Sequence, residues 1–327
     1  MSALIDTFGR LHDDLRVSIT DRCNLRCVYC LEEDAAFRPR EELLTRAELA
    51  RVGAVARALG VEAVRITGGE PLVRAEAVSI VEDFAALGFG DVSLTTNGTR
   101  LARLAGPLAA AGLRRVNVSC DSLRPERFGT IRRRGRLEEV LEAMDAAEQA
   151  GLSPIKVNVV LARGVNEDEI LDFAAFARTY GRVVRFIELM PLDAGGAWRR
   201  AQVVPSAEVL AHIGERWPLE AVSSPGDPAP AVRYRFADGA GEIGVIATVT
   251  QPFCGTCNRL RVTADGMVRN CLFSDDERAL RPLLRAGASD EELAAVFHGV
   301  LRAKRAGHGI DEPGFLRPRR SMSMIGG

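Results

Sequence analysis

Short apolar segments alternate with longer amphipathic segments along residues 13–190. The apolar segments, each typical of a buried β-strand, occupy residues 14–20, 63–68, 92–98, 115–121, 155–161 and 183–189. Helical periodicity separates them. One helix is expected to begin at Thr45, with Glu48 in capping-box position, and another to end at Gly151. This alternation, without hairpin turns, predicts parallel strands joined by crossover helices.

Six strand–helix units predict the α/β fold class, as a partial (β/α)6 barrel of the TIM type. In such barrels the functional residues lie at the carboxyl ends of the strands. Several residues of interest lie at or just beyond the ends of the predicted strands: Cys23, Gly69, Asn97, Ser119 and Met190. We therefore expect the chemistry at that end of the barrel.

The pattern changes at SSPGDPAPA, residues 223–231, which is rich in turn-forming residues. Beyond it, alternating segments around two Ala-Asp-Gly turns predict β-hairpins, and helical periodicity follows over 276–287 and 289–305. We expect two domains, a barrel over 1–222 and a smaller C-terminal α+β domain over 223–327. Residues 314–327 lack periodicity and are expected to form a disordered, mobile tail that ends in two glycines.

The charge and hydropathy of the chain exclude some partners. The formal net charge is −1, which offers no overall attraction for nucleic acid. No apolar run reaches the roughly 20 residues that a membrane helix needs, and the N-terminus lacks the basic start and apolar run of a signal peptide. We therefore expect no nucleic-acid or membrane partner and a cytoplasmic protein, whose thiols stay reduced.

Three of the seven cysteines follow the first predicted strand, in the order Cys23-Asn-Leu-Arg-Cys27-Val-Tyr-Cys30. In a reducing compartment such a group indicates metal or cluster ligands rather than disulfides. Three thiolates can hold one face of a [4Fe–4S] cluster and leave the fourth iron open to bind and reduce a ligand. The alternative is structural zinc, which requires a fourth Cys or His, and the nearest histidine, His12, precedes the strand.

A second trio, Cys254, Cys257 and Cys271, flanks one of the predicted hairpins. Its alternatives are a degenerate zinc ribbon and a four-ligand cluster completed by Cys120 or a distant residue. Cys120 lies within a predicted strand and is more typical of a small core residue. If the second trio also holds a cluster with one open iron, a substrate atom such as a purine nitrogen or oxygen would occupy that iron.

The spacing of the first trio, with an aromatic residue before its last cysteine, resembles the signature of the radical S-adenosylmethionine superfamily. A second match is Gly68-Gly69-Glu70-Pro71, which follows the second predicted strand. The resemblance implies that this stretch lies against the methionine moiety and that the amino and carboxylate groups of S-adenosylmethionine chelate the open iron. An electron then cleaves the sulfonium to methionine and a 5′-deoxyadenosyl radical, which abstracts hydrogen from the substrate.

Over its whole length the chain resembles the GTP 3′,8-cyclase family of molybdenum cofactor biosynthesis. The resemblance runs from DLRVSITDRCNLRCVYC through ITGGEPL, LTTNG, RVNVSCDSL, KVNVV and FIELMPL to CGTCNRLR, NCL and the terminal Gly-Gly. It implies hydrogen abstraction from C3′ of GTP and attack of the carbon radical on C8, giving (8S)-3′,8-cyclo-7,8-dihydroguanosine 5′-triphosphate.

The same resemblance implies cofactors and partners. The cofactors are two [4Fe–4S] clusters and S-adenosylmethionine. The reductant is a protein of the flavodoxin or ferredoxin type, and cyclic pyranopterin monophosphate synthase acts downstream on the product. The resemblance is also compatible with a homodimer.

A role is implied for each matching position. The cluster that binds S-adenosylmethionine is held by Cys23, Cys27 and Cys30, and the one that binds guanine by Cys254, Cys257 and Cys271. Contacts to S-adenosylmethionine are implied for Tyr29, Gly69, Ser119 and Met190. Contacts to GTP are implied for Arg16, Arg65, Thr95, Lys156, Arg259, Leu260 and Arg261. Lys156 stands out because the chain has only one other lysine, Lys304.

The end of the chain has two interpretations. Gly326 and Gly327 carry no side chain that would obstruct a narrow cleft, and the resemblance implies that the tail enters the active site together with Arg319 or Arg320, one of which would act in catalysis. A frayed terminus is the ordinary alternative.

Two rival functions are also considered. One is a peptide-modifying radical S-adenosylmethionine maturase with an auxiliary cluster. Such enzymes typically carry further cysteines in an extended C-terminal domain, whereas Cys271 is the last cysteine here. The other is a zinc-containing interaction module, which would be colourless where an iron–sulfur protein is brown.

Overall fold

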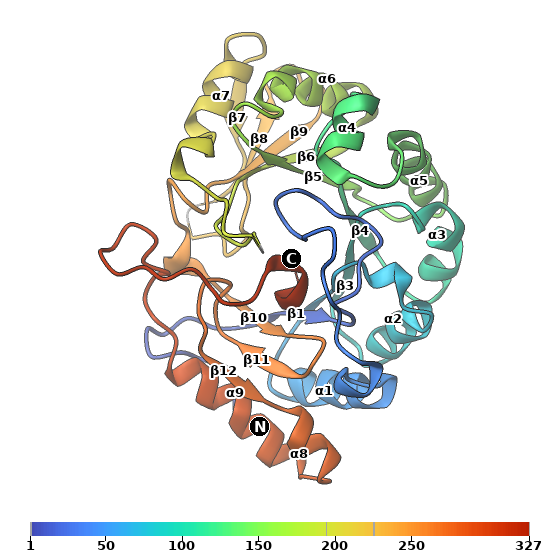
Figure 1. Ribbon diagram of the computed structural model, residues 1–327, viewed down its shortest axis with the longest axis vertical. Helices are drawn as coiled ribbons and strands as arrows, with labels where there is room; N and C mark the ends of the chain where they lie inside the picture. Colours follow the sequence, from blue (N-terminus) through green and yellow to red (C-terminus); the bar gives the residue numbers. More distant parts are fainter. Residues whose placement is uncertain (1, 194, 225, 327) are drawn as a thin grey trace.

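Parallel strands surround the centre of the molecule, at the positions that the sequence pattern predicts (Figure 1). The structure, a computed structural model, describes residues 2–193, 195–224 and 226–326. The central strands are β1 (Asp14–Ser18), β2 (Ala63–Thr67), β3 (Asp91–Thr96), β4 (Arg115–Ser119), β5 (Lys156–Leu161) and β6 (Val183–Glu188). The helices between and after them are α1 (Arg46–Ala58), α2 (Ala77–Ala86), α3 (Leu101–Ala110), α4 (Pro125–Arg132), α5 (Leu137–Gln149), α6 (Ile170–Tyr180) and α7 (Ser206–Gly214). The predicted parallel strand–helix arrangement is confirmed.

Helix α1 begins where the sequence predicts. The Thr45 hydroxyl accepts a hydrogen bond from the Glu48 N–H at 3.2 Å, and the Glu48 carboxylate accepts one from the Thr45 N–H at 2.7 Å. Both bonds satisfy N–H groups that a helix start leaves without partners. The predicted capping box is confirmed.

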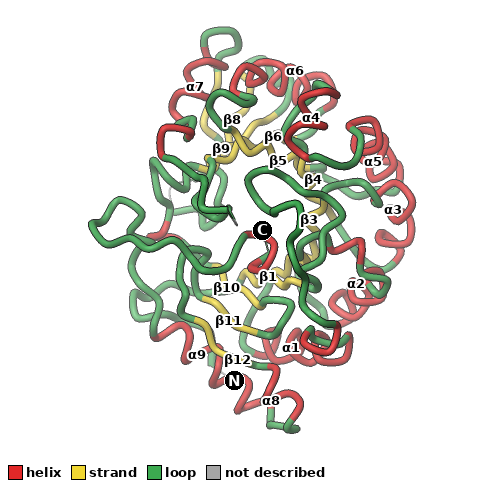
Figure 2. Tube along the Cα trace, in the orientation of Figure 1, coloured by secondary structure: helices red, strands yellow, loops and turns green. Residues whose placement is uncertain are grey.

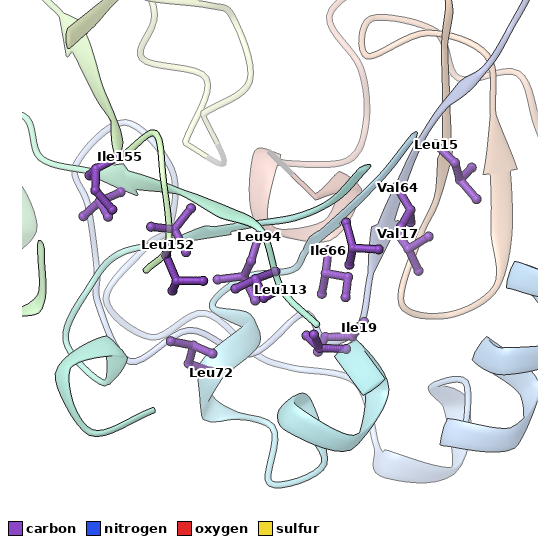
Figure 3. Close-up of a cluster of buried hydrophobic side chains, with 14 of the residues drawn as sticks. Leu15, Val17, Ile19, Val64, Ile66, Leu72, Leu94, Leu113, Leu152 and Ile155 are labelled. Carbon is purple, nitrogen blue, oxygen red and sulfur yellow. The ribbon is translucent and has the colours of Figure 1, made fainter. Parts of the chain in front are cut away.

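Alternation along the strands separates the hydrophobic core from the barrel interior. Leu15 and Val17 of β1 and Val64 and Ile66 of β2 are buried and lie together on the helix side of the sheet (Figure 3). Because successive side chains of a strand point to opposite faces, Arg16 lies on the other face and lines the interior. Apolar residues therefore build the outer layer, and polar residues of the same strands face inward.

The C-terminal part of the chain adds strands to both edges of this sheet. These strands are β7 (Leu219–Ala221), β8 (Val232–Phe236), β9 (Glu242–Ile246), β10 (Arg259–Val262), β11 (Met267–Arg269) and β12 (Glu277–Ala279). β9 pairs parallel with β6, and β10 pairs parallel with β1. In the described part of the chain, twelve strands thus form one open sheet, in the order β12-β11-β10-β1-β2-β3-β4-β5-β6-β9-β8-β7.

The antiparallel pairs β8–β9 and β10–β11 confirm the hairpins predicted around the Ala-Asp-Gly turns. β7 also pairs with β8, so one hairpin crosses the expected domain boundary at residue 222. The division into two domains stays a prediction.

The helix expected over 276–287 is wrong at its start. Residues 277–279 form β12, which pairs with β11, and the helix that follows is short, α8 (Arg281–Arg285). Glu277 accepts a hydrogen bond from the buried Arg269 of β11 at 2.6 Å, a contact across the β11–β12 pair that helical periodicity does not reveal. The helix expected over 289–305 is present as α9 (Asp290–Arg302).

The disorder expected at the end of the chain is wrong for residues 321–326. A helical turn, α10 (Met322–Ile325), lies near the centre of the ring of strands, among the loops that occupy it (Figure 2). Ile325 is buried in a small apolar cluster with Leu192, Val249 and Phe273. These contacts order a segment whose composition favours a loop. Gly327 lies outside the described residues.

None of the helices in the described ranges combines the length and the apolar character that a bilayer span demands.

Candidate active site

A cavity inside the barrel is lined by both cysteine trios. It is also lined by every residue with an implied contact to S-adenosylmethionine: Tyr29, Gly69, Ser119 and Met190. Among the residues with implied contacts to GTP, those that line it are Arg16, Arg65, Thr95, Arg259 and Arg261. The fold therefore brings residues from both ends of the chain to one place.

The loop after β1 carries the first trio. The Arg26 N–H donates to the carbonyl oxygen of Arg132 at the end of α4 (3.2 Å), and the Cys30 N–H donates to that of Cys27 (2.9 Å). Burial raises the pKa of the Cys23 thiol to about 11 and also raises the pKa of Cys27 and Cys30. Thiolates at this position therefore need a cation to stabilise them, and an iron–sulfur cluster supplies one.

The Gly68-Gly69-Glu70-Pro71 stretch packs directly on this loop. The Gly69 N–H donates to the carbonyl oxygen of Thr20 at 2.7 Å, and the Glu70 N–H donates to that of Arg22 at 2.8 Å. A Cβ atom on Gly69 would lie 2.5 Å from the carbonyl oxygens of Asp21 and Arg22. Glycine is thus required at position 69 by the contact between two loops. The sequence had indicated only a contact with a ligand as the reason for this glycine.

Tyr29 is held by a hydrogen bond to a buried ion pair, Asp121 and Arg132, which the sequence did not lead us to predict. The Tyr29 hydroxyl donates to Asp121 at 2.7 Å, and the buried guanidinium of Arg132 lies 2.9 Å from the same carboxylate oxygen. All three side chains line the cavity. Asp121 could have been found as the charged residue at the carboxyl end of the predicted strand 115–121.

The second trio comes from a 3-10 turn, η5 (Cys254–Thr256), and from the end of β11. Burial raises the pKa of the Cys254 thiol. For Cys257 burial acts in the same direction, but Arg259 and Lys304 outweigh it and lower the pKa to about 7. Cys257 is therefore the thiol of the second trio whose surroundings favour the thiolate.

The donor sets fit iron–sulfur clusters. All seven cysteines are free thiols, and three thiolates around a [4Fe–4S] cluster would leave one of its irons open to a further ligand. Among the described residues, no three His, Cys, Asp or Glu side chains are gathered as tightly as a single metal ion requires. The assignment of clusters rests on the number, spacing and chemistry of the thiols.

The register of three neighbouring strands places arginines in a row on the inner face. Arg16 of β1 lies opposite Arg261 of β10 on one side and Arg65 of β2 on the other. The Arg16 Nε atom has no hydrogen-bond partner among the described residues. Burial and the charges of Arg261 and Arg65 lower the pKa of Arg16. Buried cations that face one another favour an anion between them.

Arg185 of β6 adds a cation that the sequence interpretation missed. It lines the cavity, donates to the Asn117 side chain at 2.5 Å, and has a buried Nε atom without a partner among the described residues. A charged residue inside the apolar strand 183–188 was the available signal. Lys156 does not line the cavity in the described structure, but burial and the charges of Arg115, Arg185 and Arg65 lower its pKa to about 7.

Known proteins match this chain over almost its entire length. Residues 17–177 match the Radical SAM superfamily model, and residues 182–310 match the Molybdenum Cofactor Synthesis C model. A GTP 3′,8-cyclase of Streptomyces coelicolor is 50% identical over 99% of this chain and 96% of the relative. GTP 3′,8-cyclase 2 of Mycobacterium tuberculosis is 47% identical over 99% of this chain and 92% of the relative.

The chain belongs to the GTP 3′,8-cyclase family. Members of this family are radical S-adenosylmethionine enzymes, so the chain uses a [4Fe–4S] cluster and S-adenosylmethionine. Family membership sets aside both the zinc-containing interaction module and the peptide-modifying maturase.

Solved structures support the fold alone. Streptococcus suis SuiB bound to the precursor peptide SuiA has a TM-score of 0.62 and 14% identity, covering 91% of this chain and 69% of that one. Native anSMEcpe with bound AdoMet has a TM-score of 0.54 and 14% identity, covering 86% of this chain and 82% of that one. Both agree with a partial barrel of the radical S-adenosylmethionine type.

In this member of the GTP 3′,8-cyclase family, the tail enters the barrel as far as the structure describes it. The Gly326 carbonyl oxygen accepts a hydrogen bond from Arg261 at 2.6 Å. Gly326 has a φ of 85°, and a Cβ atom there would lie 2.5 Å from the Thr67 hydroxyl and 3.0 Å from Ser18. Glycine is therefore the residue that both the backbone conformation and the space admit.

The tail arginines lie elsewhere, and neither is among the described residues that line the cavity. Arg320 is paired with Asp265 at 3.0 Å and with Glu277 at 2.8 Å, while the Arg319 side chain is exposed. Leu260 packs in the main hydrophobic core, so that any contact with GTP would come from its backbone. A catalytic role of either tail arginine stays a prediction of the family resemblance.

Proposed function

We propose that this protein converts GTP to (8S)-3′,8-cyclo-7,8-dihydroguanosine 5′-triphosphate, the first step of molybdenum cofactor biosynthesis. The observation that carries the proposal is the meeting of two cysteine trios and a row of buried arginines in one cavity. S-adenosylmethionine at the first trio and GTP at the second would then lie close enough to react, because both would be bound within the same cavity.

Cys23, Cys27 and Cys30 would hold the cluster that supplies the electron for cleaving S-adenosylmethionine. Tyr29, Gly69, Ser119 and Met190 would contact that cofactor, which agrees with their place on the cavity wall. The Tyr29–Asp121 hydrogen bond would hold the cluster loop against the end of β4. The surrounding barrel would keep water from the radical.

Cys254, Cys257 and Cys271 would hold a second [4Fe–4S] cluster, with the guanine base at its open iron. Arg259 and Lys304, which lower the pKa of Cys257, support a site that stabilises thiolates. The triphosphate would lie along Arg261, Arg16 and Arg65, because guanidinium groups pair well with phosphate oxygens.

Substitution of Arg261 tests the triphosphate site. Arg261→Ala should weaken GTP binding by about 1.5–3 kcal/mol, the range for hydrogen bonds to charged groups, or roughly 10- to 150-fold. Binding of guanosine should change much less, because it lacks phosphates. Calorimetry with both ligands measures the difference, with the exposed Arg235→Ala as a control. An equal loss for both ligands would remove the phosphate from the explanation.

Lys156 should make GTP affinity depend on pH. Its pKa is lowered to about 7, chiefly by burial, so the charged form that attracts phosphate is lost as the pH rises through 7. The native chain should bind GTP more tightly than Lys156→Met at pH 6.5. The ratio of the two affinities should fall about eightfold from pH 6.5 to pH 8, if Lys156 stays charged in the GTP complex. Titration of the γ-phosphate is common to both proteins and cancels in this ratio. A ratio that is constant with pH would contradict the assignment of Lys156.

The proposal includes the partners that the family resemblance implies. An electron carrier of the flavodoxin or ferredoxin type would reduce the first cluster, and cyclic pyranopterin monophosphate synthase would take the product. We place the reaction in the cytoplasm, where thiols stay reduced, and a homodimer is compatible with it.

Anaerobic incubation with S-adenosylmethionine, dithionite and GTP tests the function as a whole. 5′-Deoxyadenosine and the cyclised nucleotide should form together and depend on GTP. Omission of GTP, or its replacement by ATP, serves as the control for uncoupled cleavage. Formation of 5′-deoxyadenosine with no cyclised nucleotide under any of these conditions would refute the proposed activity.

A further inference from the structure

Lys304, one of the two lysines in the chain, is buried directly behind the second cysteine trio. Its ammonium group donates to the sulfur of Cys257 at 3.6 Å and to the carbonyl oxygen of Asn270 at 2.5 Å. Asn270 immediately precedes Cys271, and its side chain donates to the Val300 carbonyl in α9 at 2.8 Å. One ammonium group therefore contacts the segments that carry two of the three thiols.

Arg10 connects the third thiol to the same segment. It donates to the carbonyl oxygen of Cys254 at 2.6 Å and to those of Arg305 and Ala306, which follow Lys304, at 2.8 and 2.9 Å. The N-terminal segment and the segment after α9 are thus held together at the second trio. All three of its cysteines are tied, directly or through one neighbour, to residues 304–306.

Arg10 is itself fixed by a buried carboxylate. Asp6 accepts hydrogen bonds from Arg10 Nε at 2.6 Å and contacts His12 Nε2 at 3.0 Å, and its side chain is fully buried. A buried Asp–Arg pair with additional hydrogen bonds has a defined geometry, unlike an exposed surface pair. Arg10 is therefore held in place, and it holds the backbone of Arg305 and Ala306, directly after Lys304, beside Cys254.

We propose that Lys304 tunes the second iron–sulfur cluster, by donating a hydrogen bond to the Cys257 thiolate and by placing a fixed positive charge beside the cluster. This inference rests on the second cluster of the proposed function. Hydrogen bonds to the sulfurs and the net charge around a cluster set its reduction potential. A cation stabilises the reduced form, which carries one more negative charge, and burial strengthens this effect. Lys304 therefore raises the potential of the second cluster.

The experiment isolates the second cluster by replacing Cys23, Cys27 and Cys30 with alanine. In this background, Lys304→Met is compared with Arg302→Met, which removes the same charge from an exposed position at the end of α9. Iron and sulfide per chain are measured after anaerobic reconstitution, and the potential is followed by electron paramagnetic resonance. Lys304→Met should decrease the ratio of reduced to oxidised cluster at a given potential at least tenfold, which is 59 mV for a one-electron couple. Arg302→Met should leave it unchanged.

Lys304→Gln separates the effect of the charge from that of the hydrogen bond. It also provides a second test if Lys304→Met does not fold or does not bind iron. It keeps an N–H donor and should retain the cluster with a lowered potential. The inference would be overturned if both Lys304 variants kept the native potential and the native iron content. It would also be overturned if Lys304→Met bound no cluster while Lys304→Gln bound one with the native potential. If the background chain binds no cluster at all, the second cluster of the proposed function fails, and this inference fails with it.

Discussion

Cys27→Ala is expected to abolish cleavage of S-adenosylmethionine, whereas Cys257→Ala should keep some uncoupled cleavage and lose the cyclised product. The two thiols line one cavity but belong to trios from opposite ends of the chain, with different surroundings. In the proposed function, the radical would be made at the first trio and guanine would be held at the second. Loss of a direct ligand should exceed the roughly 10- to 100-fold effect of losing an outer partner of a metal site.

Simultaneous measurement of 5′-deoxyadenosine and cyclised nucleotide distinguishes these two losses. Cys120→Ala is the matched control, because Cys120 is a fully buried thiol that bonds to the Ser122 carbonyl and does not line the cavity in the described structure. It should keep both products. If Cys27→Ala and Cys257→Ala lost cleavage equally, the two trios would not have distinct roles.

Gly326→Val should collapse product formation while both clusters and basal cleavage of S-adenosylmethionine remain. A side chain at this position would meet Thr67 at 2.5 Å, and the positive φ disfavours any residue other than glycine. The backbone strain alone costs about 1–3 kcal/mol, which reduces the docked tail roughly 5- to 150-fold. The hydrogen bond from Arg261 to the Gly326 carbonyl would then be lost as well.

Deletion of Gly326 and Gly327 should have the same outcome, although Gly327 lies outside the described residues. Gly129→Ala is a suitable control, because a Cβ atom there meets nothing within 4 Å. The measurements are iron content, 5′-deoxyadenosine and cyclised nucleotide for each variant. A valine variant that cyclises GTP at the native rate would show that the docked tail is not needed for the reaction.

Local patterns determined most of the fold. Strand alternation around Leu15 and Val64 and the capping box at Thr45 depend on neighbouring residues, and the structure confirms these elements. The spacing of Cys23, Cys27 and Cys30 within one loop is likewise a local property. Parallel strands aligned by crossover helices place their carboxyl ends together, so the sequence also indicated where the site lies.

Tertiary structure alone decided which distant segments meet. The row Arg261–Arg16–Arg65 depends on the pairing of β10 with β1, which are separated by more than two hundred residues. Neither hydrophobic periodicity nor residue spacing specifies such a pairing, because the register is set by packing between strands that the chain brings together only on folding. The same holds for the ordered tail and for the contact of Lys304 with Cys257, each of which depends on a partner more distant in sequence. The sequence by itself thus determined the elements, the two cysteine trios and the end of the barrel that carries the first of them, while long-range pairing decided which cations and which part of the tail surround them.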